Sequence, residues 1–125
     1  MWRHATKYGN RKVTVNGITY DSKKEARRAQ ELEALQAAGE IYGLERQFAF
    51  ELIPAQREPD RTGPKGGKIK GKTLERAVVY IADFMYRDTK TNEMVVEDTK
   101  GVRTPEYIIK RKLMLWVYGI KVKEI

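Results

Sequence analysis

The sequence predicts an α/β fold in a single domain over residues 1–125, because helix and strand signals alternate along a chain long enough for one core. Two segments begin with capping residues and end at a glycine, as helices do. The others alternate between apolar and polar residues or are rich in β-branched and aromatic residues, as strands are. The predicted order is an N-terminal β-hairpin followed by α, β, β, β, α, β.

The first half of the chain predicts the hairpin and the first helix. Asn16-Gly17 separates two alternating runs, and this pair favours a tight turn in which both central residues have positive φ. A helix follows from about residue 22 to 38. Ser22 suits its N-cap, Glu25 three residues later completes a capping box, and a glycine ends it.

The middle of the chain predicts three strands and a long loop. An alternating segment gives a strand over about 45–53, which Pro54 ends. Residues 55–75 are rich in Gly, Pro and Lys and contain no core-like run, so we expect a flexible loop there. Two apolar segments, about 76–88 and 94–101, lie on either side of a turn and predict a second hairpin.

A second helix is predicted from Thr104, which caps it, to about Tyr118. Pro105 occupies its first position and an acid lies in its first turn, both of which favour a helix start. A short strand after Gly119 completes the order. We expect the inward face of this helix to carry Ile109, Leu113 and Trp116.

The composition favours an anionic partner. The chain has 25 Lys and Arg against 17 Asp and Glu, a net charge of +8 and a pI near 9.7, and residues 1–12 form a basic arm. Nucleic acid is the simplest partner for such an excess. The absence of cysteine excludes disulfides, zinc–thiolate sites and thiol nucleophiles. No signal peptide and no apolar run near ~20 residues is present, so we expect a soluble, cytoplasmic protein.

Residues 66–73, GGKIKGKT, match the P-loop pattern of NTPases. A P-loop requires a buried strand before it and a helix N-terminus after it, because the backbone N–H groups of that helix face the phosphates. Here the preceding segment is polar, and the following segment, RAVVYIADF, is strand-like. We therefore expect the string to be a chance product of a loop rich in Gly and Lys.

The tripeptide Asp98-Thr99-Lys100 has the pattern acid-x-lysine. Similar tripeptides lie at a helix start and in a predicted turn, at residues 21–23 and 88–90, whereas this one follows a buried-looking strand. Residues two apart on a strand share a face, so Asp98 and Lys100 are predicted to point the same way and Glu97 the other way.

Asp83 adds a second carboxylate to this region. It interrupts the apolar run VVYIADFMY, where a charge is costly unless it is paired or bound to a metal, and pairing across the turn brings it level with Asp98. Two adjacent acids repel one another and favour a bound cation, and oxygen ligands favour Mg²⁺ or Mn²⁺. Glu25 lies about 40° from Ala29 on the helical wheel and tends inward towards these acids, although capping alone also explains it.

These segments together resemble the PD-(D/E)xK nuclease superfamily, whose restriction-endonuclease-like core is α-β-β-β-α-β with a central mixed sheet flanked by helices. More narrowly, YIADFMY, VVEDTKG and TPEYIIKRKL, with DSKKEARRAQELE as first helix, resemble a group of small phage-encoded nucleases long catalogued as a domain of unknown function. The resemblance covers about residues 20–124. Ala82 stands where the superfamily's name has proline, and the literal Pro59-Asp60 lies in the predicted loop.

The resemblance implies a metal-dependent endonuclease that hydrolyses phosphodiester bonds of DNA, acting in DNA processing or recombination in the cytoplasm of a phage host. It implies that Asp83, Asp98 and the Thr99 carbonyl hold Mg²⁺ or Mn²⁺, with Glu25 helping directly or through water. The metal would polarise a phosphoryl oxygen and lower the pKa of a bound water. Lys100 would orient or deprotonate that water, or stabilise charge on the phosphate. Holliday-junction resolvases share this core, and a resolvase would act as a homodimer.

Cations outside this cluster are candidates for contacts with phosphates. Lysines in the loop can follow a phosphate backbone without reading sequence, while a solvated surface explains the helix cations equally well. The alternative to a nuclease is a non-catalytic nucleic-acid-binding protein in which Asp98 and Lys100 form a salt-bridged strand end. The candidate nucleic-acid-binding residues are Lys68, Lys70, Lys72, Arg103, Tyr107, Lys110 and Lys112.

Overall fold

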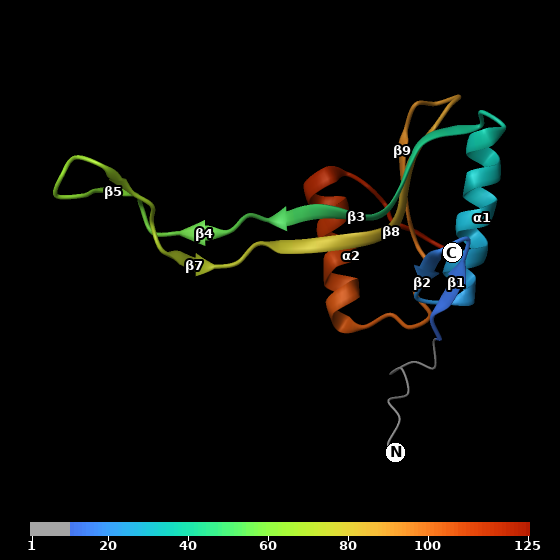
Figure 1. Ribbon diagram of the computed structural model, residues 1–125, viewed down its shortest axis with the longest axis horizontal. Coiled ribbons are helices and arrows are strands. Elements are labelled where there is room, and N and C mark those ends of the chain that lie inside the picture. The colour runs from blue at the N-terminus through green and yellow to red at the C-terminus, as the bar shows by residue number, and fades with distance from the viewer. Residues whose placement is uncertain (1–10) are drawn as a thin grey trace, which may run out of the picture.

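The computed structural model describes residues 11–125, so nearly all of the predicted basic arm over residues 1–12 lies outside the described residues. Figure 1 shows a body of strands and two helices, from which a thin two-stranded arm extends. No helix within residues 11–125 has the length and apolarity needed to cross a membrane. The elements are β1 (Val13–Val15), β2 (Ile18–Tyr20), α1 (Lys23–Ala37), β3 (Ile41–Ile53), β4 (Gln56–Arg57), β5 (Arg61–Thr62), β6 (Lys68–Ile69), β7 (Thr73–Glu75), β8 (Val78–Asp88), β9 (Met94–Asp98), α2 (Pro105–Tyr118) and β10 (Lys123–Glu124).

The central sheet has four strands in the order β10-β9-β8-β3. β8 pairs antiparallel with both β3 and β9, and β9 pairs parallel with β10, which confirms the prediction of an α/β fold around a mixed sheet. The predicted hairpin is also present as β1 and β2, with positive φ at Asn16 and Gly17. Phe84 of β8 lies opposite Glu97 of β9, so Asp83 is level with the end of β9.

Two apolar cores lie on opposite faces of β9. Val96 packs into the core under α2 with Tyr80 and Met114, and the next residue along, Glu97, points to the face that α1 covers. Phe84 and Leu32 belong to the α1 core. Each large apolar side chain buried in this way contributes roughly 1.5–3 kcal/mol. The end of β9 is therefore enclosed from both sides.

Both long helices begin at the predicted caps. Ser22 Oγ accepts a hydrogen bond from the Glu25 N–H at 3.1 Å, and Thr104 Oγ1 accepts one from the Tyr107 N–H at 3.1 Å. Each bond satisfies a backbone donor that the first turn of a helix leaves free. α2 ends at Gly119, whose φ of +68° is a left-handed conformation that costs glycine little. The two capped helix starts fix the positions of the segments that precede them.

The prediction of a flexible loop over residues 55–75 is wrong. This segment forms two short antiparallel pairs, β4 with β7 and β5 with β6, which continue outward from β3 and β8 as the arm at the left of Figure 1. Almost all of its residues are exposed, so it shows no apolar pattern that would predict strands. Main-chain pairing builds the arm instead.

The prediction that Ile109 and Trp116 face inward is also wrong. Trp116 is 85% exposed and Ile109 is 59% exposed, whereas Tyr107 and Met114 are the residues of α2 that are buried. Leu113 packs against the core as expected. A helical wheel fixes the angles between residues, but α2 carries apolar residues on more than one side, so its sequence does not select the buried face.

Candidate active site

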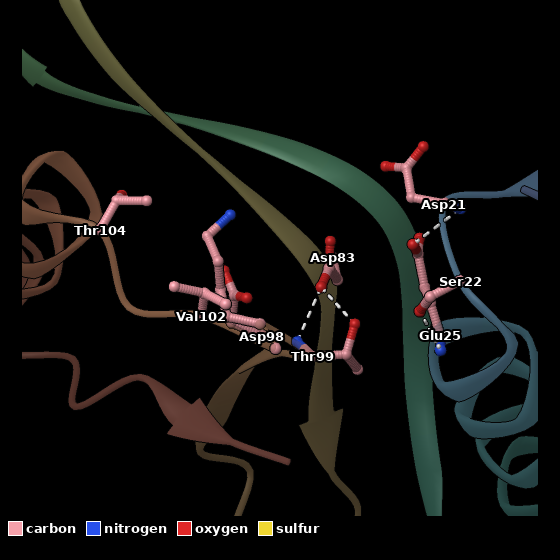
Figure 2. Close-up of a pocket in the computed structure, with 10 residues that line it drawn as sticks. Asp21, Ser22, Glu25, Asp83, Asp98, Thr99, Val102 and Thr104 are labelled. Atoms are coloured by element: carbon pink, nitrogen blue, oxygen red, sulfur yellow. Dashed lines mark hydrogen bonds between the residues drawn. The ribbon is translucent and has the colours of Figure 1, made fainter. Parts of the chain in front are cut away.

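The end of β9 meets β8 at Asp83. The Asp83 Oδ2 atom accepts two hydrogen bonds of 2.7 Å, one from the Thr99 N–H and one from the Thr99 hydroxyl (Figure 2). The chain leaves the sheet directly after Asp98, and these two bonds hold the departing segment against β8. The predicted convergence of Asp83 with the Asp98-Thr99-Lys100 tripeptide is thus present in the structure.

Gln47 marks a break in the sheet at the same level. It lies between the pairs Arg46↔Phe84 and Phe48↔Ala82, which places it opposite Asp83, and its φ is +51°. A left-handed conformation is uncommon for a residue with a side chain and alters the direction in which neighbouring side chains point. The Gln47 side-chain amide donates to Glu25 Oε1 at 3.1 Å and reaches Asp83 Oδ1 at 3.5 Å. Gln47 therefore connects the two carboxylates.

Glu25 contacts both the start of α1 and the polar residues of the sheet. Its Oε2 atom accepts a hydrogen bond from the N–H of Asp21 at 3.2 Å, one residue before the N-cap Ser22 whose N–H a capping box would use, while Oε1 faces Gln47 and lies 3.6 Å from the Arg46 guanidinium. The side chain is 2% exposed. Burial, and then repulsion from Asp83, raise the pKa of the Glu25 carboxyl above its ordinary value. The ionised form of Glu25 therefore destabilises the folded protein unless a further cation lies beside it.

Asp98 is buried, and one of its oxygens lacks a partner. The Tyr80 hydroxyl donates to Oδ2 at 2.6 Å, but Oδ1 is buried with no hydrogen-bond partner among residues 11–125. Burial raises the pKa of the Asp98 carboxyl, and the nearby Asp83 raises it further, although the Tyr80 hydrogen bond acts in the opposite direction. An unpaired buried carboxylate oxygen is costly, which is the environment in which a bound cation is most stabilising.

Glu97 points to the other face of the sheet, as the alternation of β9 predicts. Arg28 of α1 makes a bidentate ion pair with it: Nε lies 2.7 Å from Oε1 and Nη2 lies 2.7 Å from Oε2. The Tyr86 hydroxyl also donates to Oε2, and Glu97 is fully buried. Glu97 is therefore a structural residue that joins α1 to the sheet.

A pocket of about 210 Å³ brings the predicted catalytic residues together. It lies between the start of α1 and the end of β9, and Figure 2 shows that both segments contribute side chains to it. Lys100 and Thr104 also line a second pocket of about 240 Å³ beside α2, so the two pockets are neighbours. Lys100 is exposed, with Nζ 5.4 Å from the centre of the Tyr107 ring. The lining of the first pocket includes Glu25, Asp83, Asp98, Thr99 and Lys100.

The donor set of this pocket fits a hard divalent cation. Asp83 and Asp98 are adjacent acids, and the buried Asp98 Oδ1 needs a positive partner. Within residues 11–125, no three acidic or histidine side chains are grouped closely enough to enclose an ion by themselves. Mg²⁺ commonly takes one or two carboxylates and keeps several waters, so two acids are sufficient for it. The residues present therefore match Mg²⁺ or Mn²⁺ better than a metal that needs nitrogen or sulfur ligands.

The predicted nucleic-acid-binding residues separate into distinct regions. Lys110 lines the second pocket and pairs with Glu106 at 3.0 Å, and Arg103 pairs with Glu124 at 2.6 Å. Tyr107 is 3% exposed and belongs to the core, although it also lines the second pocket. Lys112 is exposed on α2 beside a different pocket. The remaining candidates, all on the arm, are Lys68, Lys70 and Lys72.

Three residues of the site carry no signal in the sequence. Gln47 and Tyr80 are ordinary strand residues until the sheet places them beside acids far away in sequence. Arg46 lies near Glu25 for the same reason, with its guanidinium 4.2 Å from the centre of the Tyr20 ring. A polar residue within the alternating run LERQFAF was the one available hint, and it does not distinguish an exposed position from a site.

The raised pKa of Asp98 leads to a prediction about stability. The folded protein binds a proton on this carboxyl more tightly than the unfolded chain does, so stability falls as pH rises above about 4 through the raised pKa. Without metal, Asp98→Asn is therefore expected to raise the thermal unfolding midpoint at pH 7.5, and the gain should shrink towards pH 4. Scanning calorimetry in EDTA at both pH values measures this.

Asp88 provides a control of opposite sign. Hydrogen bonds from the Thr91 and Lys90 N–H groups lower the pKa of the Asp88 carboxyl, so its ionised form favours folding above about pH 4. Asp88→Asn should lower the unfolding midpoint at pH 7.5. If Asp98→Asn and Asp88→Asn shift the midpoint in the same direction at this pH, the assignment of a destabilising buried charge to Asp98 is wrong.

Comparison with known proteins gives one family. Residues 5–123 match the family described as "Protein of unknown function (DUF1064)". No curated protein and no solved structure gives a significant match to the chain.

Proposed function

This chain belongs to the family of proteins of unknown function DUF1064, and we propose that it is a metal-dependent endonuclease of the PD-(D/E)xK type that hydrolyses phosphodiester bonds of DNA. One observation carries the proposal. Five residues expected from the sequence to act together, from α1, β8 and the end of β9, line a single pocket. The net charge of +8 supports a polyanionic substrate.

Asp83 and Asp98 would hold the metal ion, with the Thr99 backbone and water completing its ligands and Glu25 acting directly or through water. When bound, Mg²⁺ or Mn²⁺ neutralises charge on the scissile phosphate and makes water a better nucleophile. Tyr80 and Thr99 orient the two carboxylates by hydrogen bonds, and Gln47 sets the spacing between Asp83 and Glu25. These contacts organise the acids before any substrate arrives.

Lys100 is the positive group on the substrate side of this cluster. Its side chain is exposed and lines both pockets, so a phosphate in either pocket lies within its reach. It orients or deprotonates the attacking water, or stabilises negative charge that develops on the phosphate. Lys110, which lines the second pocket, is placed to contact the backbone next to the scissile bond.

A non-catalytic nucleic-acid-binding protein is the second candidate. It is favoured by the finding that no three acidic or histidine side chains of residues 11–125 stand together as a ready ligand set. In that case, Asp98 and Lys100 would be a polar strand end beside a basic surface. The buried, unpaired Oδ1 atom of Asp98 argues against this, because such an arrangement destabilises the protein without any benefit to binding.

The P-loop interpretation has no structural support. Residues 66–73 lie on the arm, from its turn through β6 to the start of β7, and strands follow them. The backbone N–H groups of a helix N-terminus, on which a P-loop depends, are therefore not next to this string.

Incubation of the purified protein with supercoiled plasmid tests the proposal. We expect nicked and linear products with Mg²⁺ or Mn²⁺, and none with EDTA or without protein. A panel of labelled linear, flap, single-stranded and four-way-junction DNA, with matching RNA, would then identify the substrate class. Binding without cutting on every substrate, with either metal, would favour the second candidate.

A further inference from the structure

The arm, residues 54–77, has a defined backbone structure but no apolar core. Its backbone is held by β-pairing and by further hydrogen bonds across it, from the Glu58 N–H to the Lys72 carbonyl at 2.8 Å and from the Gly63 N–H to the Gly67 carbonyl at 2.7 Å. Nearly every side chain on it is exposed. A ribbon that buries so little apolar surface adds little to the stability of the fold, which points to a purpose in contacts with another molecule.

The middle of the arm has a defined shape. Asp60 Oδ1 accepts a hydrogen bond from the Gly71 N–H at 2.7 Å, and its other oxygen pairs with Lys68 at 3.2 Å. Gly71 passes so close to Glu58 that a Cβ atom there would lie 1.7 Å from the Glu58 carbonyl oxygen. Close backbone approach of this kind requires glycine. The two halves of the arm are thus locked together where β4–β7 gives way to β5–β6.

The arm is strongly basic. It holds seven cations and three acids, so its net charge is +4, half of the +8 that the whole chain carries. Among the described residues, Lys68 is the arm cation that forms an ion pair. The cations are Arg57, Arg61, Lys65, Lys68, Lys70, Lys72 and Arg76.

The arm is continuous with the strands that carry the active site. β3 holds Gln47 and β8 holds Asp83, and both strands run outward into the arm (Figure 1). At about 3.3 Å per residue, the extended chain places Lys72 up to ~36 Å and Lys68 up to ~50 Å from Asp83. One turn of B-form DNA is about 34 Å long. Lys72 and Lys68 can therefore reach about one to one and a half helical turns to one side of the site.

We propose that the arm is a β-ribbon that docks in the major groove of a DNA duplex, about one helical turn to one side of the phosphate held in the pocket. The major groove of B-DNA is wide enough for a two-stranded ribbon, and its walls are lined with phosphates that match the arm's charge. This rests on the proposed function for the location of the cut, but not for the binding itself. The proposal implies that the substrate is a DNA duplex that extends well beyond the cut on one side, and this extension is called the flank.

Charge and groove shape favour this occupant over two others. A second copy of the arm would bring two surfaces of net +4 together, which is repulsive. Duplex RNA has a deep and narrow major groove that would not admit the ribbon. Both alternatives appear as outcomes in the experiment below.

The test measures binding alone, by fluorescence anisotropy in EDTA. The protein carries Asp98→Asn so that no DNA is cut, and the arm variant adds Lys65→Gln, Lys70→Gln and Lys72→Gln. The matched control adds instead Lys90→Gln, Lys121→Gln and Lys123→Gln, which remove the same charge from exposed positions elsewhere. Ligands are DNA duplexes of about 12 and about 30 base pairs, roughly one and three helical turns, and an RNA duplex of the longer length. Sedimentation of each variant reports oligomeric state.

We expect the arm variant to lose roughly tenfold or more in affinity for the long DNA duplex, with a flatter salt dependence, because it has lost phosphate contacts. Its affinity for the short duplex and for RNA should match that of the control.

Groove docking would be overturned if both variants lost affinity equally, or if the arm variant lost affinity equally for both DNA lengths or for RNA. It would also be overturned if the arm substitutions dissociated a dimer. Flank-dependent binding, combined with no metal-dependent cleavage of plasmid by the protein without substitutions, would uphold the arm and reject the nuclease. Cleavage by the protein without substitutions, combined with binding that does not depend on the flank, would do the reverse.

Discussion

Asp98→Asn is expected to reduce Mg²⁺-dependent cleavage of plasmid DNA by about a hundredfold or more, as removal of a group in direct contact with a metal or transition state commonly does. The substitution keeps the shape of the side chain and an oxygen that can accept from Tyr80. It removes the charge that would hold the cation beside Asp83. The measurement is the initial rate of nicking over a range of Mg²⁺ concentrations.

Asp88→Asn is the matched control for this experiment. Asp88-Thr89-Lys90 repeats the residues of Asp98-Thr99-Lys100 but lies where β8 ends and the turn to β9 begins, away from the pocket. Its cleavage rate should stay within about twofold of the unmodified protein, since surface changes of this kind rarely exceed ±0.5 kcal/mol. Equal rates for Asp98→Asn and Asp88→Asn would remove Asp98 from the active site.

The stability prediction for Asp98→Asn makes the result easy to interpret. Because loss of this buried charge is expected to raise the unfolding midpoint of the metal-free protein, a loss of cleavage would not be explained by unfolding. Metal should stabilise only the unmodified protein. Saturating Mg²⁺ or Mn²⁺ should raise the midpoint of the unmodified protein, but not that of the variant.

Arg28→Ala is expected to lower the free energy of unfolding by about 3–5 kcal/mol, which is the usual result of removing one partner of a buried ion pair. The carboxylate of Glu97 would keep its hydrogen bond from Tyr86 but would lose both bonds from the guanidinium, while remaining fully buried. Urea denaturation followed by circular dichroism measures the change.

Arg27→Ala is the control, because Arg27 neighbours Arg28 on α1 but is exposed. It should change the free energy of unfolding by less than about 0.5 kcal/mol. Replacing the buried pair by Arg28→Met with Glu97→Leu should recover much of the stability that Arg28→Ala loses, since no buried charge then remains unpaired. Similar stabilities for Arg27→Ala and Arg28→Ala would show that the ion pair contributes little.

The alternation of side chains along a β-strand thus gives the adjacent acids Glu97 and Asp98 different functions. Successive side chains point to opposite faces of a sheet, so Glu97 meets α1 and Asp98 meets the pocket. Glu97 lies one residue from Asp98, but its substitution alone would leave Arg28 without its buried partner and lower stability, so it would not test the active site. Distance in sequence is therefore a poor guide to control residues here, and Asp88 is the better choice.

Much of the fold followed from local signals in the sequence. The Asn16-Gly17 turn, the caps at Ser22 and Thr104 and the glycine that ends α2 are interactions within a few residues, so they survive in almost any tertiary setting. The sequence also predicted that Asp83 lies level with Asp98, because a short turn between two strands fixes their register. Convergence of the two acids was predictable for that reason, although they lie on the two inner strands and not at an edge of the sheet.

Only the tertiary structure decided the features that depend on distant contacts. The arm is made by backbone pairing of exposed, polar segments, and such pairing leaves no periodic apolar pattern to read. Gln47 and Tyr80 enter the site through the arrangement of β3 and β8, and Trp116 faces outward because other residues of α2 fit the core better. The sequence by itself determined which acids and which lysine could form a site. The packing of the sheet determined what surrounds them, because the free energies of burial and of pairing depend on neighbours that local sequence does not specify.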